Sequence, residues 1–400
     1  KEGLLALSVG VGLQVMASIM EEDVTTACGT RSKHNPGRAG YRHSTEAGSV
    51  TLGGRRVPVQ RPRVRAVDGS GELALPSYQL FSATDMLGEM AMERMLAGLS
   101  TRRYSAGLEP VGEAVGAEAR STSKSAVSRR FVKATETALA ELMDRRLDEL
   151  DLVAIMVDGV HFGEHTCVVA LGIDIDGVKH PLALQEGATE NARVVTDLIV
   201  GLRERGLDVT RPILAVIDGA KALAKAIKDV FDQPVIHRCQ LHKIRNVEAK
   251  LPKRLREVVA KRMRAAYRAD TALTGESLLR ELAAELDQTH PGAAASLREG
   301  LTETLTVLRL AVPPTLARTL RSTNAIESMI SICRDHSENV KRWRDATMAL
   351  RWCAAGMDEA TNQFRRVNGH LHLRKLRDTL DAQVADTVSA TCQDEDQKVA

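Results

Sequence analysis

The sequence is poor in aromatic residues, has no disulfide pattern and carries almost no net charge. Aromatics make up 3% of its 400 residues, which argues against a large all-β or carbohydrate-stacking protein. The six cysteines are scattered without a Cys-x-x-Cys pair, as expected for a reduced, intracellular protein. Because the formal net charge is only +3, the distribution of charge along the chain matters more than its total.

Long apolar runs are also missing, apart from "LLALSVGVGLQVMASIM" at 4–20. This run is about the minimum length for a membrane span, but it contains Gly10, Gly12 and Gln14. No basic segment beyond Lys1 precedes it, and no clear small-residue cleavage site follows. We therefore predict a buried or dimer-forming helix here and no membrane partner. The length and the 44% hydrophobic content predict two or three globular domains.

A basic hairpin is predicted within the first region, 1–79. The stretch "GSVTLGGRRVPVQRPRVRAV" (48–67) alternates apolar and basic residues around Gly53-Gly54, which is typical of a β-hairpin. Eight arginines lie between positions 31 and 65. Such a ribbon could lie on phosphates or form a solvated sheet edge, and the pattern does not separate these interpretations.

The second region, 80–150, has helical periodicity. The segment "ATDMLGEMAMERMLAGLS" repeats apolar residues every three to four positions and ends near Gly98. "STSKSAVSRRFVKATETAL" (121–139) then has small polar residues at its start and Val127, Phe131 and Val132 on one face. This layout predicts a helix-turn-helix that binds DNA, with a plain helical linker as the alternative. The candidate DNA-binding residues are Lys124, Arg129 and Arg130.

From residue 151 the pattern changes to mixed α/β. The apolar run in "DLVAIMVDGV" (151–160) and the stretches "TCVVALGIDIDG" (166–177) and "VKHPLALQ" (178–185) predict three strands, with Asp176-Gly177 as a hairpin turn. A helix closed by Gly206, a strand ending at Asp218, another helix, the short strand "PVIH" and a further helix follow. This order suits a ribonuclease H-like mixed sheet, assigned to 151–238 and 321–365.

An all-helical insertion is predicted between these segments, at 239–320. Eleven Lys and Arg residues and only two Glu residues lie between 236 and 268, giving this stretch a charge of +9. A solvated helix normally mixes signs, so we predict a surface that faces a polyanion. The remaining residues, 366–400, are assigned to a C-terminal tail.

Three carboxylates are candidate metal ligands. Asp158 and Asp218 each follow an apolar strand and precede a glycine, and strand ends gather ligands at the edge of an α/β sheet. Glu327 lies just beyond the first turn of a helix that Ser322 or Thr323 can cap, with Arg334 two turns along the same face. Alternatively, the Asp-Gly pairs mark turns and Glu327 is a solvated residue. Local spacing does not separate these alternatives.

"HRCQLH" (237–242) contains His237, Cys239 and His242, which suggests zinc. A structural zinc site needs a fourth ligand, and no second Cys-x-x-Cys or His-x-x-x-His pair is present, so zinc is disfavoured. Trp352 is predicted to lie in the core. Trp343 follows Lys341 and Arg342 and is either a core residue or a platform on which an unpaired base stacks.

Together these stretches resemble the mutator-type transposases of bacterial insertion sequences, over about residues 80–380. The matching segments are "STSKSAVSRRF", "VDGVHFGE", "ALGIDIDGVKHPLALQEGATEN", "VIDGAKALAKAI", "VIHRCQLHKIRN", "STNAIES" and "NVKRWRDATMALRWCAAGM". The resemblance implies a ribonuclease H-like domain with a DDE triad at Asp158, Asp218 and Glu327, interrupted by a helical insertion. It also places the family's Cys-x-x-His signature on Cys239 and His242.

The implied activity is cleavage and strand transfer of DNA that depends on two Mg²⁺ ions, for which Mn²⁺ could substitute. The implied partners are terminal inverted repeats and target DNA, bound by a homodimer in the cytoplasm on the nucleoid. The candidate DNA-contacting residues in this part of the chain are Cys239, His242, Lys243, Arg245, Arg334, Lys341, Arg342 and Trp343. The alternatives are another nuclease of this fold and a catalytically inactive or regulatory DNA-binding protein. Glu338, in "RDHSENV", stands where a more basic run is expected.

Overall fold

The computed structural model describes residues 2–108, 111–189 and 191–383. The chain divides into two compact units between Thr137 and Ala138. Each unit has its own sheet, and the two are described separately below.

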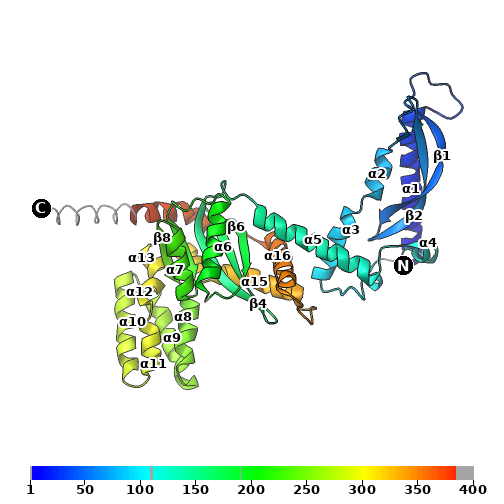
Figure 1. Ribbon diagram of the computed structural model, residues 1–400. Helices are drawn as coiled ribbons and strands as arrows, with labels where there is room; N and C mark the ends of the chain where they lie inside the picture. Colours follow the sequence, from blue (N-terminus) through cyan, green and yellow to red (C-terminus); the bar gives the residue numbers. More distant parts are fainter. Residues whose placement is uncertain (1, 109–110, 190, 384–400) are drawn as a thin grey trace. The chain divides into compact units, whose positions relative to one another are not determined.

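The first unit contains the predicted hairpin. Helix α1 (Glu2–Cys28) packs beside β1 (Gly40–Leu52) and β2 (Arg55–Ala66), which pair antiparallel and are extended by β3 (Glu72–Leu73) (Figure 1). Gly53 and Gly54 form the turn with φ of +55° and +76°, values that favour glycine. The prediction of a hairpin at this point is therefore confirmed.

Several of the hairpin's arginines bond within the unit. Arg56 donates to Ser49 and to the carbonyl of Ser82, while Arg61 pairs with Glu46 and Arg63 with Glu72. Arg42 donates to Thr25 and pairs with Glu21. For these four arginines the structure favours the interpretation that they stabilise the sheet.

The apolar run at 4–20 is helical, as predicted, but most of its large side chains are not buried. Leu4, Leu7, Val11, Val15 and Ile19 are exposed, whereas Met20, Val24 and Cys28 pack into the unit. Most of this run is thus not buried within the chain, because only the end of α1 reaches the sheet, and the alternative of a dimer-forming helix stays a prediction. Within the described residues, no helix combines the length and apolar character needed to cross a bilayer.

The rest of this unit is helical. It comprises α2 (Pro76–Ser82), α3 (Asp85–Leu96), η1 (Ser105–Gly107), α4 (Glu113–Glu118) and the first part of α5 (Lys124–Asp144). Helix α5 buries Val127, Phe131 and Thr135 at helical spacing. The two stretches predicted to be helical are present as α3 and α5, and the short helix α4, which was not predicted, precedes α5.

The second unit is built on a five-stranded mixed sheet. Its strands are β4 (Leu152–Phe162), β5 (His165–Asp174), β6 (Lys179–Glu186), β7 (Ile213–Ile217) and β8 (Pro234–Arg238), in the order β6-β5-β4-β7-β8. β5 runs antiparallel to β4 and β6, whereas β4, β7 and β8 are parallel. The strands, together with α6 (Ala192–Glu204) and α7 (Lys221–Val230), follow the predicted order.

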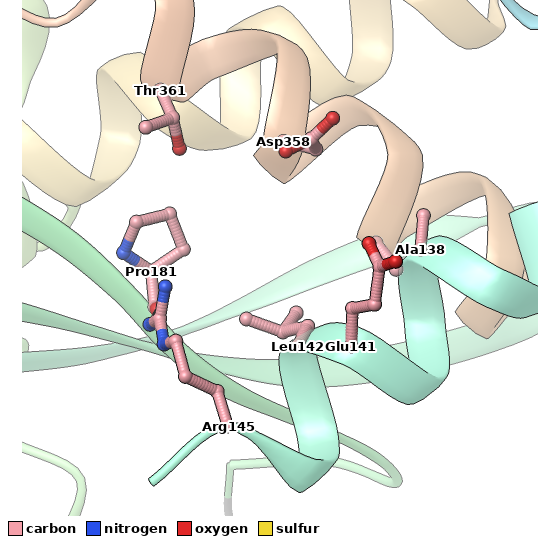
Figure 2. Close-up of a pocket in the computed structure, with 8 residues that line it drawn as sticks. Ala138, Glu141, Leu142, Arg145, Pro181, Asp358 and Thr361 are labelled. Atoms are coloured by element: carbon pink, nitrogen blue, oxygen red, sulfur yellow. The ribbon is translucent and has the colours of Figure 1, made fainter. Parts of the chain in front are cut away.

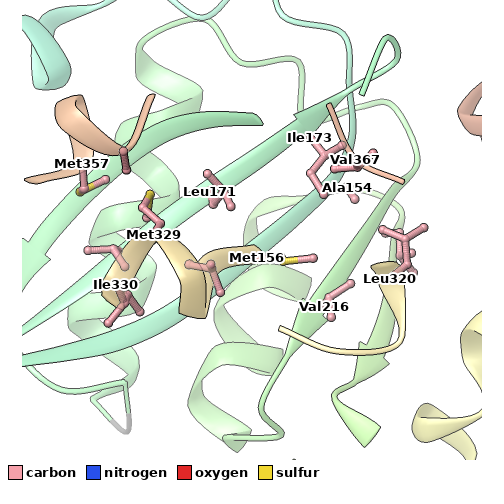
Figure 3. Packing of buried hydrophobic residues seen from close by; sticks show 14 of the residues in the cluster. Ala154, Met156, Leu171, Ile173, Val216, Leu320, Met329, Ile330, Met357 and Val367 are labelled. Atoms are coloured by element: carbon pink, nitrogen blue, oxygen red, sulfur yellow. The ribbon is translucent and has the colours of Figure 1, made fainter. Parts of the chain in front are cut away.

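Both faces of this sheet are covered, because side chains alternate along each strand. Ile155 and Val157 point into the core under α6 and α7, while Ala154 and Met156 point to the opposite face. There they meet α15 (Asn324–Ser337) and α16 (Ala346–Gln363), as Figure 3 shows. The helix that carries Glu327 is therefore packed directly on the sheet.

The stretch from 239 to 320 is helical, as predicted, and has its own apolar core. Its helices are α8 (Gln240–Ala249), α9 (Lys253–Ala266), α10 (Ala272–Asp287), α11 (Pro291–Arg298), α12 (Leu301–Thr304), α13 (Thr306–Arg309) and α14 (Pro314–Leu320). The Thr306 hydroxyl donates to the carbonyl of Ile236 at 2.8 Å, which ties this helical part to β8.

The region predicted as a tail contributes to the core up to the end of the described residues. After η2 (His370–His372), Leu373, Leu376 and Leu380 are fully buried against the sheet. Arg377 donates to Asp151 and to the carbonyls of Leu152 and Pro212 at 2.6 Å each. Residues 384–400 of the predicted tail lie outside the described part of the chain.

Candidate functional site

Asp158 and Asp218 lie level with each other on neighbouring parallel strands. Met156 pairs with Val216 in this register, so two residues further on Asp158 stands opposite Asp218. Asp158 is not at a strand end as predicted, because β4 continues to Phe162 as one arm of the β4–β5 hairpin. Asp218 follows directly after the end of β7. Adjacent strands are about 4.8 Å apart, so the two carboxylates share one edge of the sheet.

The packing of α15 places Glu327 beside this edge. Ile326, Met329, Ile330 and Cys333 are buried at helical spacing and face the sheet. Glu327 lies next to this stripe, with 31% of its side chain exposed. Its side chain is therefore neither in the core nor fully in solvent.

The electrostatics link the three carboxylates. Burial raises the pKa of Asp158 to about 6, and the negative charges of Asp218 and Glu327 add to this shift. The backbone N–H of Gly159 and the side chain of His242 oppose it. The edge of the sheet thus concentrates negative charge, which a bound cation would offset.

Each carboxylate is also held by a local hydrogen bond. Asp158 accepts from the N–H of Gly159 at 2.7 Å, Asp218 from that of Ala220 at 2.9 Å, and Glu327 from the hydroxyl of Thr323 at 2.9 Å. Among the residues that the structure describes, no three His, Cys, Asp or Glu side chains are grouped closely enough to hold a metal ion. Binding a metal between these carboxylates would therefore require their side chains to move together.

The start of α8 forms the other wall of the site. The N–H of Cys239 donates to the carbonyl of Ile217, next to Asp218, at 2.7 Å. His242 Nε2 lies 3.7 Å from Glu327 Oε1. Burial opposes ionisation of the Cys239 thiol, but hydrogen bonds from His242 and Thr323 outweigh it and lower its pKa. The bond to Cys239 in turn raises the pKa of His242.

A protein-family model described as "Transposase, Mutator family" matches residues 7–367 of this chain. The chain belongs to this family. Among curated relatives, the transposase of insertion sequence element IS6120 from Mycolicibacterium smegmatis is 29% identical over 68% of this chain and 84% of that protein. The ISRM5 transposase of Rhizobium meliloti is 24% identical over 91% and 90%. The IS256 transposase of Staphylococcus aureus is 27% identical over 66% and 67%.

Two predicted DNA contacts of this transposase need correction. Lys243 is fully buried, and its ammonium donates to the carbonyls of Ser296 and Glu299. Burial lowers its pKa to about 8. Cys239 is also fully buried. Neither side chain is at a surface that DNA can reach in this structure, since both join α8 to neighbouring elements.

The other predicted contacts lie at the surface to different degrees. Lys124, Arg129, Arg245, Arg334, Lys341 and Arg342 are exposed, and His242 and Arg130 are partly exposed. Arg130 donates to the carbonyl of Ser121 at 2.7 Å, so part of its guanidinium is engaged. Lys124, Arg129 and Arg130 belong to the first unit, and the remainder belong to the second.

The two tryptophans pack together. Trp352 is buried, as predicted, and lies edge-on to Trp343 with 6.2 Å between ring centroids. Trp343 is partly exposed and also contacts Phe162, with a centroid distance of 4.9 Å. The tip of the β4–β5 hairpin, just beyond Asp158, is therefore held against the segment before α16.

One feature of the site that the sequence did not indicate is the contact between Gly219 and Arg238. A Cβ at Gly219 would lie 2.0 Å from Arg238 Nε, and φ at this position is +107°. Glycine after Asp218 is thus required by the buried Arg238 side chain as well as by the turn. Gly219, Lys221, Lys225 and Arg238 line one part of a cleft of about 420 Å³ that begins beside Asp218.

A second cavity, of about 250 Å³, lies away from the predicted site residues (Figure 2). The residues that line it include Glu141 near the end of α5, Arg145 just after that helix, Pro181 of β6 and Asp358 of α16. Burial, together with the negative charge of Glu141, raises the pKa of Asp358. None of the predicted ligands or DNA contacts lies on its wall.

The buried His237 makes the stability of the second unit sensitive to acid. Burial lowers its pKa to about 4, from an ordinary value of 6.5. The unfolded chain therefore binds a proton that the folded chain does not as pH falls from 6.5 towards 4. We expect this to cost about 3 kcal/mol of unfolding free energy across that window. Urea titrations at several pH values measure the unfolding free energy of the wild type and of His237→Gln. This free energy should fall less steeply with decreasing pH in the variant, and equal slopes for the two proteins would contradict the prediction.

Proposed function

We propose that this transposase cuts DNA at the terminal inverted repeats of its insertion sequence and joins the cut ends to target DNA. In this proposal the second unit is a ribonuclease H-like catalytic domain interrupted by a helical insertion, with Asp158, Asp218 and Glu327 as its metal ligands. The observation that carries the proposal is that the register of β4 and β7 brings Asp158 of β4 level with Asp218, which directly follows β7, beside the helix that carries Glu327. The strand order and the antiparallel β5 support the fold assignment.

The donor set fits Mg²⁺, with Mn²⁺ as a substitute. All three side chains offer hard carboxylate oxygens, and the negative charges of Asp218 and Glu327 add to the burial that raises the pKa of Asp158. When bound, a pair of such ions would activate an attacking oxygen and stabilise a leaving oxygen on a phosphodiester. No nucleophilic side chain of the protein is needed in this chemistry.

The residues around the carboxylates have distinct roles in the proposal. The backbone of Asp158 is held by a sheet that is buried on both faces, and Asp218 follows directly after one of its strands. Glu327 is on α15, which packs on this sheet. His242, with 26% of its side chain exposed, is placed to contact a phosphate beside Glu327.

The proposed DNA surface includes the exposed basic residues of the helical insertion. Arg245, Lys250, Lys253, Arg254, Lys261 and Arg268 are exposed there. Within the described residues none of these six is in an ion pair, whereas Arg262, on α9 with Lys253, Arg254 and Lys261, is neutralised by Glu285. Unpaired positive charge of this kind binds the phosphate backbone without reading sequence.

We expect Lys253→Ala, Arg254→Ala and Lys261→Ala combined to weaken DNA binding and to lower its dependence on salt. Each lost phosphate contact reduces the slope of log K against log salt by roughly one. Fluorescence anisotropy at several salt concentrations measures both quantities. The matched control is Arg262→Ala on the same helix, which should change the slope little because Glu285 already pairs with it. Equal slopes for the triple variant and this control would contradict the proposed surface.

Sequence-specific recognition of the terminal repeats is assigned to α4 and α5 of the first unit, through Lys124, Arg129 and Arg130. Because two ends must be held together for joining, the proposed active form is a homodimer on DNA in the nucleoid. Alternative functions are a nuclease without end specificity and a DNA-binding protein without activity.

The decisive experiment is incubation of the full chain with Mg²⁺ and DNA that carries the element's ends. Nicking at the ends followed by strand transfer supports the transposition chemistry. Binding without any cleavage would favour a catalytically inactive or regulatory protein, and cleavage at unrelated sites would favour another nuclease.

A further inference from the structure

The hydroxyl of Thr323 is buried at the junction of the three segments that form the site. Thr323 has no exposed surface and stands directly before α15. Its Oγ1 lies 2.9 Å from Glu327 Oε1, 3.4 Å from Cys239 Sγ and 3.4 Å from His242 Nδ1. The sequence suggested only a helix cap for this residue.

Thr323 does not use its side chain as a cap in this structure. A threonine at this position normally accepts a hydrogen bond from an N–H of the first helical turn, and Thr323 makes no such bond. Its hydroxyl carries one proton, and the shortest of its contacts is to the Glu327 carboxylate. The hydroxyl thus donates to Glu327. The backbone nitrogen of Thr323 lies 3.5 Å from Cys239 Sγ and donates to it.

The surroundings of Thr323 are rigid. Cys239 is anchored to the end of β7 through the carbonyl of Ile217, and the N–H of Gln240 donates to the carbonyl of Arg321 at 3.0 Å. These bonds fix the start of α15 relative to the strand that leads into Asp218. A donor held in this way fixes one oxygen of Glu327, while Oε2 makes no hydrogen bond with any described residue.

We propose that Thr323 is a positioning residue that holds Oε1 of Glu327 and leaves Oε2 available to bind a metal ion at the edge of the sheet. This inference rests on the proposed function, in which Glu327 is a ligand. Without the hydroxyl, the nearest partner of Oε1 is His242, at 3.7 Å, and the carboxylate turns towards that ring. Groups that orient a metal ligand typically change metal affinity by about 10- to 100-fold when removed.

The test compares Mn²⁺ binding, measured by electron paramagnetic resonance, with cleavage of DNA ends. We expect Thr323→Val to weaken Mn²⁺ binding about tenfold. Thr323→Ser, which keeps the hydroxyl, should stay within about twofold of the wild type for both binding and cleavage. If Thr323→Val does not fold, Thr323→Ala removes the same hydroxyl without placing a methyl group beside Cys239. Wild-type Mn²⁺ affinity in the folded variant would overturn the inference.

Thr306→Val is the matched control. It also removes a buried hydroxyl that donates a hydrogen bond, but Thr306 bonds to the carbonyl of Ile236 and none of its contacts involves Glu327. Both variants should lose stability, and only Thr323→Val should lose Mn²⁺ affinity. Equal losses of affinity in the two would assign the effect to general destabilisation and overturn the inference.

A double-mutant cycle separates this inference from the proposed function. If Thr323 acts through Glu327, Thr323→Val should have no further effect on Mn²⁺ affinity in a Glu327→Gln background. If Glu327→Gln lowers affinity and Thr323→Val does not, only the role of Thr323 fails. If Glu327→Gln changes neither Mn²⁺ binding nor cleavage, the proposed ligand set fails, and the role of Thr323 fails with it.

Discussion

Replacing Asp158 by Asn should abolish cleavage of DNA ends and leave the protein folded. The same result is expected for Asp218→Asn and Glu327→Gln, because each change removes one of three proposed metal ligands. We expect each to lower the rate of end cleavage by at least about 10³-fold, as measured in single-turnover assays on labelled ends. DNA binding should persist, since it rests mainly on basic residues elsewhere.

The stability of Asp158→Asn gives an independent readout. Burial and the negative charges of Asp218 and Glu327 disfavour ionised Asp158 in the metal-free protein. A neutral side chain removes that cost, so the metal-free variant should be as stable as the wild type or more stable, by up to about 3 kcal/mol at pH 7. A large loss of stability would instead assign Asp158 a structural role.

Asp176→Asn is the matched control for these variants. It is the same chemical change at another Asp-Gly step, in the exposed turn between β5 and β6. Activity should stay at the wild-type level. If Asp176→Asn and Asp158→Asn lowered activity equally, the assignment of the ligands would be wrong.

Leu376→Ala should destabilise the second unit by about 3–5 kcal/mol, which is the usual cost of a buried Leu→Ala change. Leu376 is fully buried in the cluster that also contains Met329 and Ile330 of the Glu327 helix. Loss of this packing should therefore lower the stability of the whole unit and the fraction of active protein. Urea denaturation followed by tryptophan fluorescence measures it, because both tryptophans belong to this unit.

Leu371→Ala is the matched control for Leu376→Ala. Leu371 lies five residues earlier and is 81% exposed, so its removal should change the unfolding free energy by less than about 0.5 kcal/mol. Equal denaturation midpoints for the two variants would mean that the segment after Arg366 does not pack on the sheet as described.

The sequence predicted the order of strands and helices because their signals are local. Apolar runs of strand length, Asp-Gly and Gly-Gly turns and helical periodicity gave β4 to β8, the helical insertion and the N-terminal hairpin. In a ribonuclease H-like sheet, the fold that the sequence favours, the first and fourth strands are neighbours, and β4 and β7 pair in this way. This pairing places Asp158 next to Asp218.

Contacts between distant segments could not be predicted in this way. Thr323 meets Cys239 across 84 positions, and neither residue type signals a partner. Lys243 belongs to a strongly basic run, yet its side chain is buried. The sequence did not predict this, because charge content does not show which side of a helix faces the core. Similarly, the apolar run at 4–20 indicated a helix but not that most of its large side chains are exposed.

The position of a bound metal ion would show whether Asp158, Asp218 and Glu327 are the metal ligands. Crystals of the full chain with Mn²⁺ and a DNA end, examined by anomalous scattering, would locate the ions. We expect Mn²⁺ at the edge of the sheet, coordinated by Asp158, Asp218 and Glu327. Mn²⁺ bound elsewhere, or coordinated by the two aspartates without Glu327, would show that the proposed ligand set is wrong.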